Sequence, residues 1–243
     1  MAGHSHWAGI KHKKGRADKE RSKIFSKLSK EITVAAKLGD KDPDMNPRLR
    51  TAIQAAKQAN MPKDNISRAI SKSEMGGDKN YENLRYEGFG SFNIAFIIET
   101  LTDNKNRSAS SIRTVLQKNG GRLGESGSTK HMFNNCGILQ FEKNKLSEDE
   151  AFEAAINAGA KDCVSLKNTF EIVTEKEDFY KIKTVLEKKI DTFSYSAIEW
   201  RAYNYINLDK EQSKKTAEIL NTLEELDDVQ NIFTNANFQN IQI

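Results

Sequence analysis

The sequence has only two cysteines and no long apolar run, and both shortages narrow the class of protein. Cys136 and Cys163 are isolated, so one chain can build neither a disulfide framework nor a four-thiolate zinc site. We interpret both as small packing residues. No apolar run approaches the roughly 18 residues that a membrane-spanning helix needs. The N-terminus lacks the apolar core and cleavage site of a signal peptide, so we expect a soluble cytoplasmic protein in a reducing compartment.

Histidine is also scarce, because His131 is the only one after position 12. Neither cysteine lies in a local nucleophile pattern. The acidic pairs Glu224-Glu225 and Asp227-Asp228 fall where a helix should end in solvent, which is a poor setting for acid-base catalysis. No catalytic constellation emerges from these residues. We therefore expect no enzyme activity and no cofactor.

Two further patterns, three histidines near the N-terminus and a glycine-containing loop, could indicate a metal site and a phosphate-binding loop. His4, His6 and His12 lack a carboxylate or thiolate partner and lie among lysines that oppose a divalent cation, so we expect no metal site. The segment 124–128 has the glycines of a phosphate-binding loop, but the lysine of a P-loop is not in place. A flexible turn is the simpler interpretation.

Charge is distributed unevenly along the 243 residues. Residues 1–75 contain 17 Lys+Arg against 8 Asp+Glu, a net of +9, whereas residues 76–243 contain 21 against 26, a net of −5. The whole-chain value of +4 therefore hides a basic part joined to a mildly acidic part. Such asymmetry bears on binding partners rather than on fold.

The first forty residues organise this positive charge. A basic arm, residues 3–16, leads into a predicted helix over residues 18–38. On a helical wheel, five lysines fall within an arc of roughly 80°; they are Lys19, Lys23, Lys27, Lys30 and Lys37. The apolar residues fall on the far side; they are Ile24, Phe25, Leu28, Ile32 and Ala35. We expect the apolar side to pack against protein and the lysines to face solvent.

A polyanion is the natural partner for such a surface, with Trp7 stacking on bases while cations follow the phosphate backbone. The predicted nucleic-acid-binding residues are Trp7, Lys11, His12, Lys13, Lys14, Arg16, Lys19, Lys23, Lys27 and Lys30. Lysine outnumbers arginine 28 to 10, which favours contacts to backbone and shape over base readout. Two alternatives stay open: a merely solvated charged face, and a module that binds acidic lipid or an acidic protein, although the apolar side suits a protein core better than a membrane.

Helix signals continue after Gly39, which can close the first helix. Asn46 is a predicted cap of a second helix that begins at Pro47, and Pro62 starts a third short helix. Their buried sides are predicted from apolar spacing; these residues are Leu49, Ile53, Ala56, Ile66, Ala69 and Ile70. The glycine-containing segment 74–80 is a predicted linker.

From Leu84 onward the pattern is mixed α/β. We predict a strand within 92–101, a helix at 108–119, and two short strands flanking Asn134-Asn135. Between 137 and 205 the predicted order is strand, helix, strand, strand, helix, strand, at 138–142, 148–158, 162–166, 169–174, 176–188 and 195–205. This βαββαβ order is typical of the ferredoxin-like split motif. A helix after Asp209 and a strand at 229–233 follow.

The economical arrangement is an insertion, because residues 84–134 supply only part of a second βαββαβ unit that the last helix and strand would complete. We therefore predict an α+β fold of three domains: an all-α N-terminal domain and two ferredoxin-like α/β domains, one inserted in the other. The predicted boundaries are 1–78 for the basic helical domain, 79–135 plus 206–243 for the split domain, and 136–205 for the inserted domain.

Several blocks closely resemble the YebC/PmpR family, which includes the mitochondrial translational activator of a cytochrome oxidase subunit. The matching blocks cover almost the whole chain and are most specific near the N-terminus. They are residues 3–5, 7–14, 46–50, 60–70, 86–90, 101–107, 159–162 and 226–230. The chain departs from the family pattern at Ser91-Phe92-Asn93, where Pro-Gly-Gly is usual, and at His131, where tryptophan is common.

The resemblance implies a helical domain followed by two α/β domains, and a non-enzymatic regulator of gene expression. Family members are described as DNA-binding transcriptional regulators, and others resemble ribosome-associated translation factors that help synthesis through proline-rich stretches. Promoter DNA and ribosomal RNA therefore both stay open as the partner. We expect the acidic α/β domains to position the basic domain or to meet a protein partner. The oligomeric state is not predicted. Because the family motif begins at Gly3, we expect no mitochondrial presequence.

Overall fold

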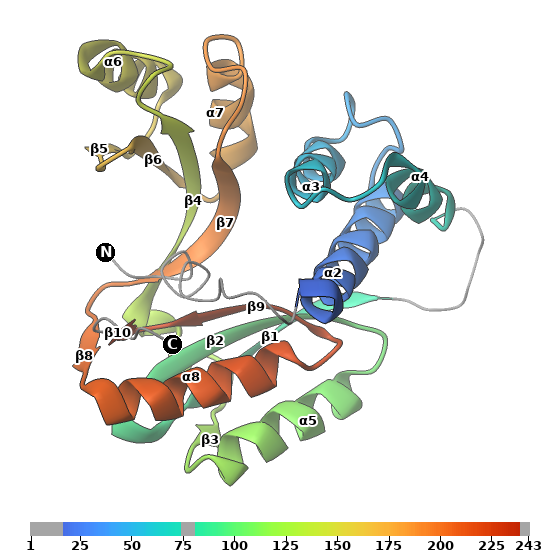
Figure 1. The fold of residues 1–243 in the computed structure, drawn as a ribbon, viewed down its shortest axis with the longest axis vertical. Helices are drawn as coiled ribbons and strands as arrows, with labels where there is room; N and C mark the ends of the chain where they lie inside the picture. The colour runs from blue at the N-terminus through green and yellow to red at the C-terminus, as the bar shows by residue number, and fades with distance from the viewer. Residues whose placement is uncertain (1–16, 74–80, 239–243) are drawn as a thin grey trace. The chain divides into compact units, whose positions relative to one another are not determined.

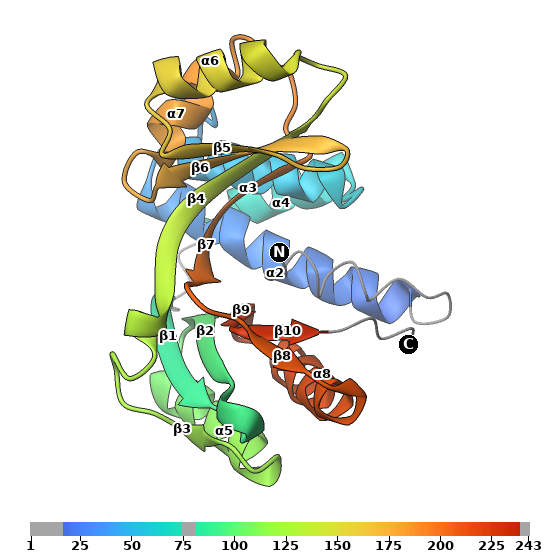
Figure 2. The same cartoon turned by 90° about the vertical axis from the view of Figure 1, so that its left-hand side faces the viewer.

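The computed structural model describes residues 17–73 and 81–238, with side chains described from Arg21 onward. The chain forms two compact units. One combines the residues up to Asn134 with those from Arg201, and the other spans Asn135–Trp200. The second unit is thus an insertion in the sequence of the first, close to the predicted segment 136–205. Figures 1 and 2 show both units from two directions.

Three helices form a small bundle at the start of the first unit: α2 (Ala17–Leu38), α3 (Pro47–Gln58) and α4 (Lys63–Ser71). Asn46 caps α3 by accepting a hydrogen bond from the Leu49 N–H at 3.0 Å, as the sequence predicts. The predicted buried residues of all three helices gather in one core, which includes Ile32, Leu49 and Ile66. The expectation is wrong at Ile24, which is 48% exposed, whereas its neighbour Phe25 packs against the core.

The rest of the first unit is a four-stranded sheet with order β3-β1-β2-β9. The strands are β1 (Glu82–Phe89), β2 (Ala95–Thr102), β3 (Arg122–Leu123) and β9 (Val229–Thr234), and a 3₁₀ turn, η1 (Ser91–Asn93), joins the first two. Helices α5 (Lys105–Lys118) and α8 (Lys210–Glu224) cover one face of this sheet (Figure 1). Alternate residues of β2, Phe96 and Ile98, are fully buried beneath them, as period-two side-chain alternation requires.

Three details of this region differ from the predictions. Strand β1 was not predicted, because its alternating charged and apolar residues, partly exposed, gave no clear strand signal. As a result the element order is ββαβ before the insertion, not the start of a βαββαβ unit. The two short strands predicted around Asn134-Asn135 are one continuous strand, β4 (Phe133–Glu142), preceded by a 3₁₀ turn, η2 (Lys130–Met132). Helix α5 begins three residues before the predicted start, because Asn104 caps it.

The second unit has the predicted βαββαβ order. Its sheet, β5-β6-β4-β7, joins β4 to β5 (Asp162–Ser165), β6 (Thr169–Glu175) and β7 (Tyr195–Ala202). Helices α6 (Glu148–Ala158) and α7 (Phe179–Leu186) pack on one face (Figure 2). The capping box at Ser147 and Glu150 and the left-handed Gly159 that ends α6 are confirmed. The ferredoxin-like prediction is therefore confirmed for the inserted unit.

A small parallel pair, β8 (Ile206–Leu208) with β10 (Ala236–Phe238), was also not predicted. Asn235, 1% exposed, connects this pair to the main sheet, because its side chain accepts from the Ala95 N–H and its carbonyl accepts from the Ile206 N–H, both at 2.8 Å. In the described parts of the chain, no helix is long and apolar enough to cross a membrane.

Candidate nucleic-acid interface

The predicted nucleic-acid-binding residues are placed unequally by the structure. All those in the basic arm lie outside the described residues; they are Trp7, Lys11, His12, Lys13, Lys14 and Arg16. The backbone of Lys19 belongs to α2, but its side chain also lies outside the described part. Lys23, Lys27 and Lys30 follow one another along α2, as the helical periodicity predicts.

The expectation that the whole lysine row faces solvent is wrong at Lys30. Its side chain is only 17% exposed, and its ammonium donates to the carbonyl oxygens of Asp227 at 3.0 Å and Leu101 at 3.2 Å. The same ammonium lies 5.4 Å from the centre of the Tyr81 ring, within the range of a cation–π contact. Lys23 pairs with Glu225 at 3.4 Å and keeps a side-chain exposure of 34%. Intramolecular acceptors therefore hold part of the predicted row.

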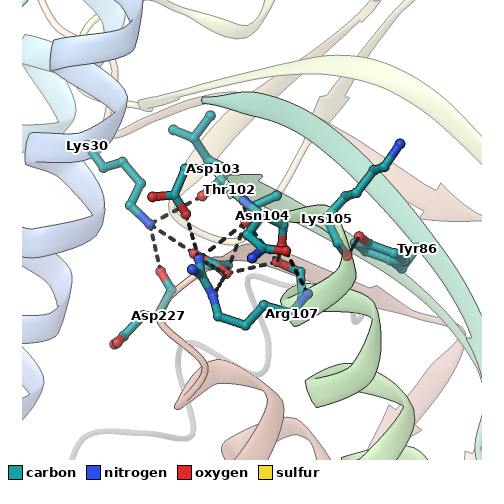
Figure 3. A network of polar contacts seen from close by, with 11 residues as sticks. Lys30, Tyr86, Thr102, Asp103, Asn104, Lys105, Arg107 and Asp227 are labelled. Atoms are coloured by element: carbon teal, nitrogen blue, oxygen red, sulfur yellow. Dashed lines mark hydrogen bonds and ion pairs between the residues drawn. The ribbon is translucent and has the colours of Figure 1, made fainter. Parts of the chain in front are cut away.

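Asp228 is the centre of the network that receives Lys30. Figure 3 shows Lys30, Thr102 and Arg107 converging on this network from three elements of the first unit. Asp228 Oδ2 accepts from Arg107 Nη2 at 2.7 Å and Nε at 3.1 Å, from Ser108 Oγ at 2.8 Å and from Thr102 Oγ1 at 3.1 Å. Asp103 accepts a further bond from Arg107 Nη2 at 2.8 Å. Asp228 is 8% exposed, so the prediction of a solvated carboxylate pair at this helix end is wrong for this residue.

Local structure explains why these groups meet. Asn104 caps α5 by accepting from the Arg107 N–H at 3.0 Å, which places Arg107 and Ser108 in the first turn of the helix. The Leu101 N–H donates to the Asp228 carbonyl at 2.9 Å, which fixes the end of β2 against the start of β9. Local sequence patterns do not predict this contact, because 120 positions separate Ser108 from Asp228. The signal available was that both lie in or next to blocks that match the family.

Two opposing effects set the protonation of Asp228. Burial raises the pKa of its carboxyl, while hydrogen bonds from Arg107, Ser108 and Thr102 and the charge of Lys30 lower it, and the net pKa lies below the ordinary value of 3.8. Tyr86, whose hydroxyl donates to the Lys105 carbonyl at 2.8 Å, has a raised pKa because of burial and the charge of Asp228. Asp228 is thus ionised at neutral pH, while Tyr86 keeps its proton.

A hollow of about 230 Å³ adjoins the network, lined by Arg107, Ser108, Ser111 and the segment 225–229. At its wall the Asp228 carboxylate already bonds the Arg107 guanidinium, and no histidine or cysteine lines the hollow. In the described ranges 17–73 and 81–238, no group of three or more His, Cys, Asp or Glu side chains could hold a metal. The arrangement joins the end of β2 and the start of α5 to the start of β9.

The end of the glycine-containing loop at 124–128 and the two residues after it surround an anionic side chain of the protein itself. Glu87, 2% exposed, accepts from the N–H groups of Gly127 at 3.0 Å, Thr129 at 2.6 Å and Lys130 at 2.9 Å. Burial raises the pKa of Glu87, but these hydrogen bonds outweigh it and the pKa is lowered. The loop is therefore a structural turn around Glu87, consistent with our simpler interpretation.

Both cysteines have free thiols, and their surroundings agree with packing roles. Cys136 is 1% exposed. Burial, with the nearby charges of Asp162 and Glu148, raises the pKa of Cys163 to about 11, so its thiol stays protonated and unreactive at neutral pH.

These features define an α+β protein in which a helical bundle precedes two α/β units, one inserted in the other, and whose described polar cluster is structural. Family models account for both parts: the TACO1/YebC N-terminal domain matches residues 5–76, and the TACO1/YebC second and third domain matches residues 81–236. The chain belongs to the TACO1/YebC family, as the sequence resemblance predicts.

Two relatives show how complete the match is. A protein of Pelagibacter ubique (strain HTCC1062), named a probable transcriptional regulatory protein, is 56% identical over 240 residues, covering 99% of this chain and all of the relative. The crystal structure of a conserved hypothetical protein from Aquifex aeolicus is 40% identical, with a TM-score of 0.81, covering 97% of this chain and 98% of the other. The likeness thus extends over all three parts of the fold.

Proposed function

We propose that this protein is a non-enzymatic, DNA-binding regulator of transcription. The observation that carries the proposal is the full-length relative that is 56% identical and named a probable transcriptional regulatory protein. The net charge of +9 over residues 1–75 supports it, because a basic domain attracts a polyanion and speeds association.

The contact surface in this proposal is the basic arm followed by α2. Lys11, Lys13, Lys14 and Arg16 neutralise phosphates, while Trp7 and His12 contribute contacts of shape. Lys19 and Lys27 extend the surface along α2. Lys23 contributes only where a phosphate replaces Glu225 as its partner. Lys30 is not part of this surface, because three intramolecular groups already bind its ammonium.

The acidic part of the chain has a supporting role in the proposal. Residues 76–243 carry a net charge of −5, so they are repelled by nucleic acid and are suited to position the basic domain or to meet a protein partner. The two free thiols fit a reducing compartment, and we place the function in the cytoplasm.

The test is binding to a labelled promoter-DNA duplex across a salt series. With about 4–6 phosphates engaged, the logarithm of the affinity should fall against the logarithm of salt with a slope of about −4 to −5. The triple variant Lys11→Glu, Lys13→Glu, Lys14→Glu should lose most of the affinity. An affinity that does not depend on salt, or one that the triple variant retains, contradicts the proposal.

Ribosome co-sedimentation of the same preparation decides between DNA and ribosomal RNA. At physiological salt, a specific DNA shift without ribosome association supports the proposal. Association with ribosomes under salt that abolishes the DNA shift overturns it in favour of a translational role.

A further inference from the structure

Helix α4 carries a second set of exposed cations that the sequence analysis did not assign. Lys63, Arg68 and Lys72 point to solvent, with the exposed hydroxyls of Ser67 and Ser71 between them along the helix. The opposite side is buried in the core of the bundle through Ile66 and Ala69, which are 7% and 2% exposed. We call the five exposed residues the α4 face.

The cations of the α4 face differ from other basic residues of the bundle in their pairing. Arg48 forms a two-pronged bond with Glu31, at 2.7 Å and 3.1 Å, which ties α3 to α2. Lys23 and Lys30 pair with Glu225 and Asp228. By contrast, within residues 17–73 and 81–238, no acidic group pairs with Lys63 or Lys72.

Unpaired ammonium groups keep their attraction for an external anion, because no intramolecular carboxylate has to be displaced first. The Arg68 guanidinium is oriented by hydrogen bonds within its own helix. Its Nη2 donates to Asn65 Oδ1 at 2.8 Å and its Nε to the Asp64 carbonyl at 3.2 Å, which orders the guanidinium while Nη1 stays available within the described part of the bundle. Asp64 is the one carboxylate on this side of the helix, so the local balance stays positive.

The α4 face is also rigidly mounted. Asn60 takes a left-handed conformation, φ 58°, and the Met61 N–H donates to the Ala56 carbonyl at 2.9 Å, which is the Schellman arrangement at the end of α3. Thr33 Oγ1 donates to the Ala69 carbonyl at 2.8 Å and so joins α2 to α4. The backbone that carries these cations is therefore ordered before any ligand binds, and only their side chains lose conformational entropy on meeting a phosphate.

We propose that the α4 face binds the phosphate backbone of duplex DNA. Helix α4 ends at Ser71 and Lys72 caps it, so Lys63 and Lys72 lie roughly 13 Å apart along the axis and at opposite edges of the exposed side. Arg68 lies between these edges, so the three cations can reach phosphates across the width of the helix. Ser67 and Ser71 donate hydroxyl hydrogen bonds to phosphate oxygens between the charged contacts. Lys57, exposed in the last turn of α3, lies on the other side of the Asn60 turn and extends the contact. The inference rests on the proposed DNA-binding function and adds a contact surface to it.

The experiment compares the full chain with the double variant Lys63→Gln, Lys72→Gln on a labelled DNA duplex of mixed sequence. Loss of two phosphate contacts should weaken binding by about tenfold and make the salt slope shallower by about 2 between roughly 50 and 200 mM salt. The matched control is Lys210→Gln, Lys214→Gln on α8, two exposed lysines of the acidic part of the chain. This control should keep both the affinity and the slope of the wild type.

The outcomes separate the two proposals. If wild type and control bind and the α4 variant binds equally well with the same slope, the α4 face is overturned while the proposed function stands. If the wild type binds no duplex, both proposals fail. If it binds a ribosomal RNA hairpin but no duplex, the choice of DNA is overturned. Thermal melting of each variant verifies folding, and the double variant Ser67→Ala, Ser71→Ala should independently weaken binding without changing the salt slope.

Discussion

The Lys30 ammonium and the Asp228 carboxylate lie 3.5 Å apart, Nζ to Oδ1, and join helix α2 to the turn that leads into β9. The same ammonium donates to the Asp227 and Leu101 carbonyls, so two backbone groups and one side chain converge on it. A lysine that a helical wheel places in a solvent-facing row is thereby used to attach the helical bundle to the split domain.

First, Asp228→Asn should destabilise the first unit by about 2–3 kcal/mol, because Arg107, Ser108 and Thr102 all lose a charged acceptor in a buried site. Urea unfolding followed by circular dichroism measures the change. Asp227→Asn is the matched control, since the Asp227 side chain is exposed, and it should stay within about 0.5 kcal/mol of wild type. Equal losses of unfolding free energy in both variants would show that the network does not stabilise the fold.

A double-mutant cycle tests the ion pair itself. Lys30→Gln combined with Asp228→Asn should cost less than the sum of the single changes by about 1 kcal/mol, because each single change already removes the same attraction. Urea unfolding of the four proteins gives the coupling free energy. Strictly additive losses would mean that Lys30 acts only through its bonds to the two carbonyl groups.

Second, the protein should lose stability at acidic pH through Asp228 and Glu87. Both have a folded-state pKa below the ordinary values of 3.8 and 4.5, so the unfolded chain takes up these protons first as the pH falls. Their contribution is fully present above the ordinary values and disappears as the pH falls through the lowered ones. Urea unfolding from about pH 6 to pH 3 should show this decline, and Asp228→Asn should make it shallower. Parallel curves for the two proteins would contradict the assignment.

Third, a glycine at Phe92, in the turn between β1 and β2, should relieve backbone strain. Phe92 and Asn93 both have positive φ, 63° and 60°, a conformation that costs a residue with a Cβ about 1–2 kcal/mol. Phe92→Gly should therefore be more stable than Phe92→Ala by about 1 kcal/mol, because both lose the ring but only glycine relieves the backbone. Thermal melting decides it. A smaller effect is expected for Asn93→Gly, since asparagine tolerates this conformation, and equal stability of the two Phe92 variants would refute the strain.

This turn also shows what a sequence pattern can anticipate. The family pattern of Pro-Gly-Gly differs here at Ser91-Phe92-Asn93, and that difference was visible without a structure. Its physical meaning was not, because only the backbone angles show that a glycine-like conformation is occupied by residues with side chains. Local signals of the capping type were more informative, since Asn46 and Ser147 act within three residues along the chain.

Long-range pairing limited the rest of the prediction. Strand β1 is stabilised by partners on both sides, β2 and β3, and its own residues alternate without a strong apolar face. The parallel pair β8 and β10 joins segments thirty residues apart, each only three residues long. At the site, the periodicity placed the lysines of α2 correctly on one side, but which of them face solvent depends on Asp228 and Glu225, which are distant in the sequence.

The last prediction concerns the inserted unit, where Gly137 of β4 pairs with Thr174 of β6. A Cβ at position 137 would lie 2.9 Å from the Phe179 Cβ, and closer still to the Phe179 ring and the Thr174 hydroxyl. Since Phe179 is 1% exposed in the core, it has no room to move, and Gly137→Ala should destabilise this unit by about 2–3 kcal/mol. Gly159→Ala is the control, because nothing lies within 4 Å of its added Cβ and only its φ of 85° opposes the change, so about 1 kcal/mol is expected. The fluorescence of Trp200, which is 6% exposed at the end of the unit, reports urea unfolding of both variants. A loss of stability in Gly137→Ala no larger than that in Gly159→Ala would show that α7 shifts to accommodate the added methyl group.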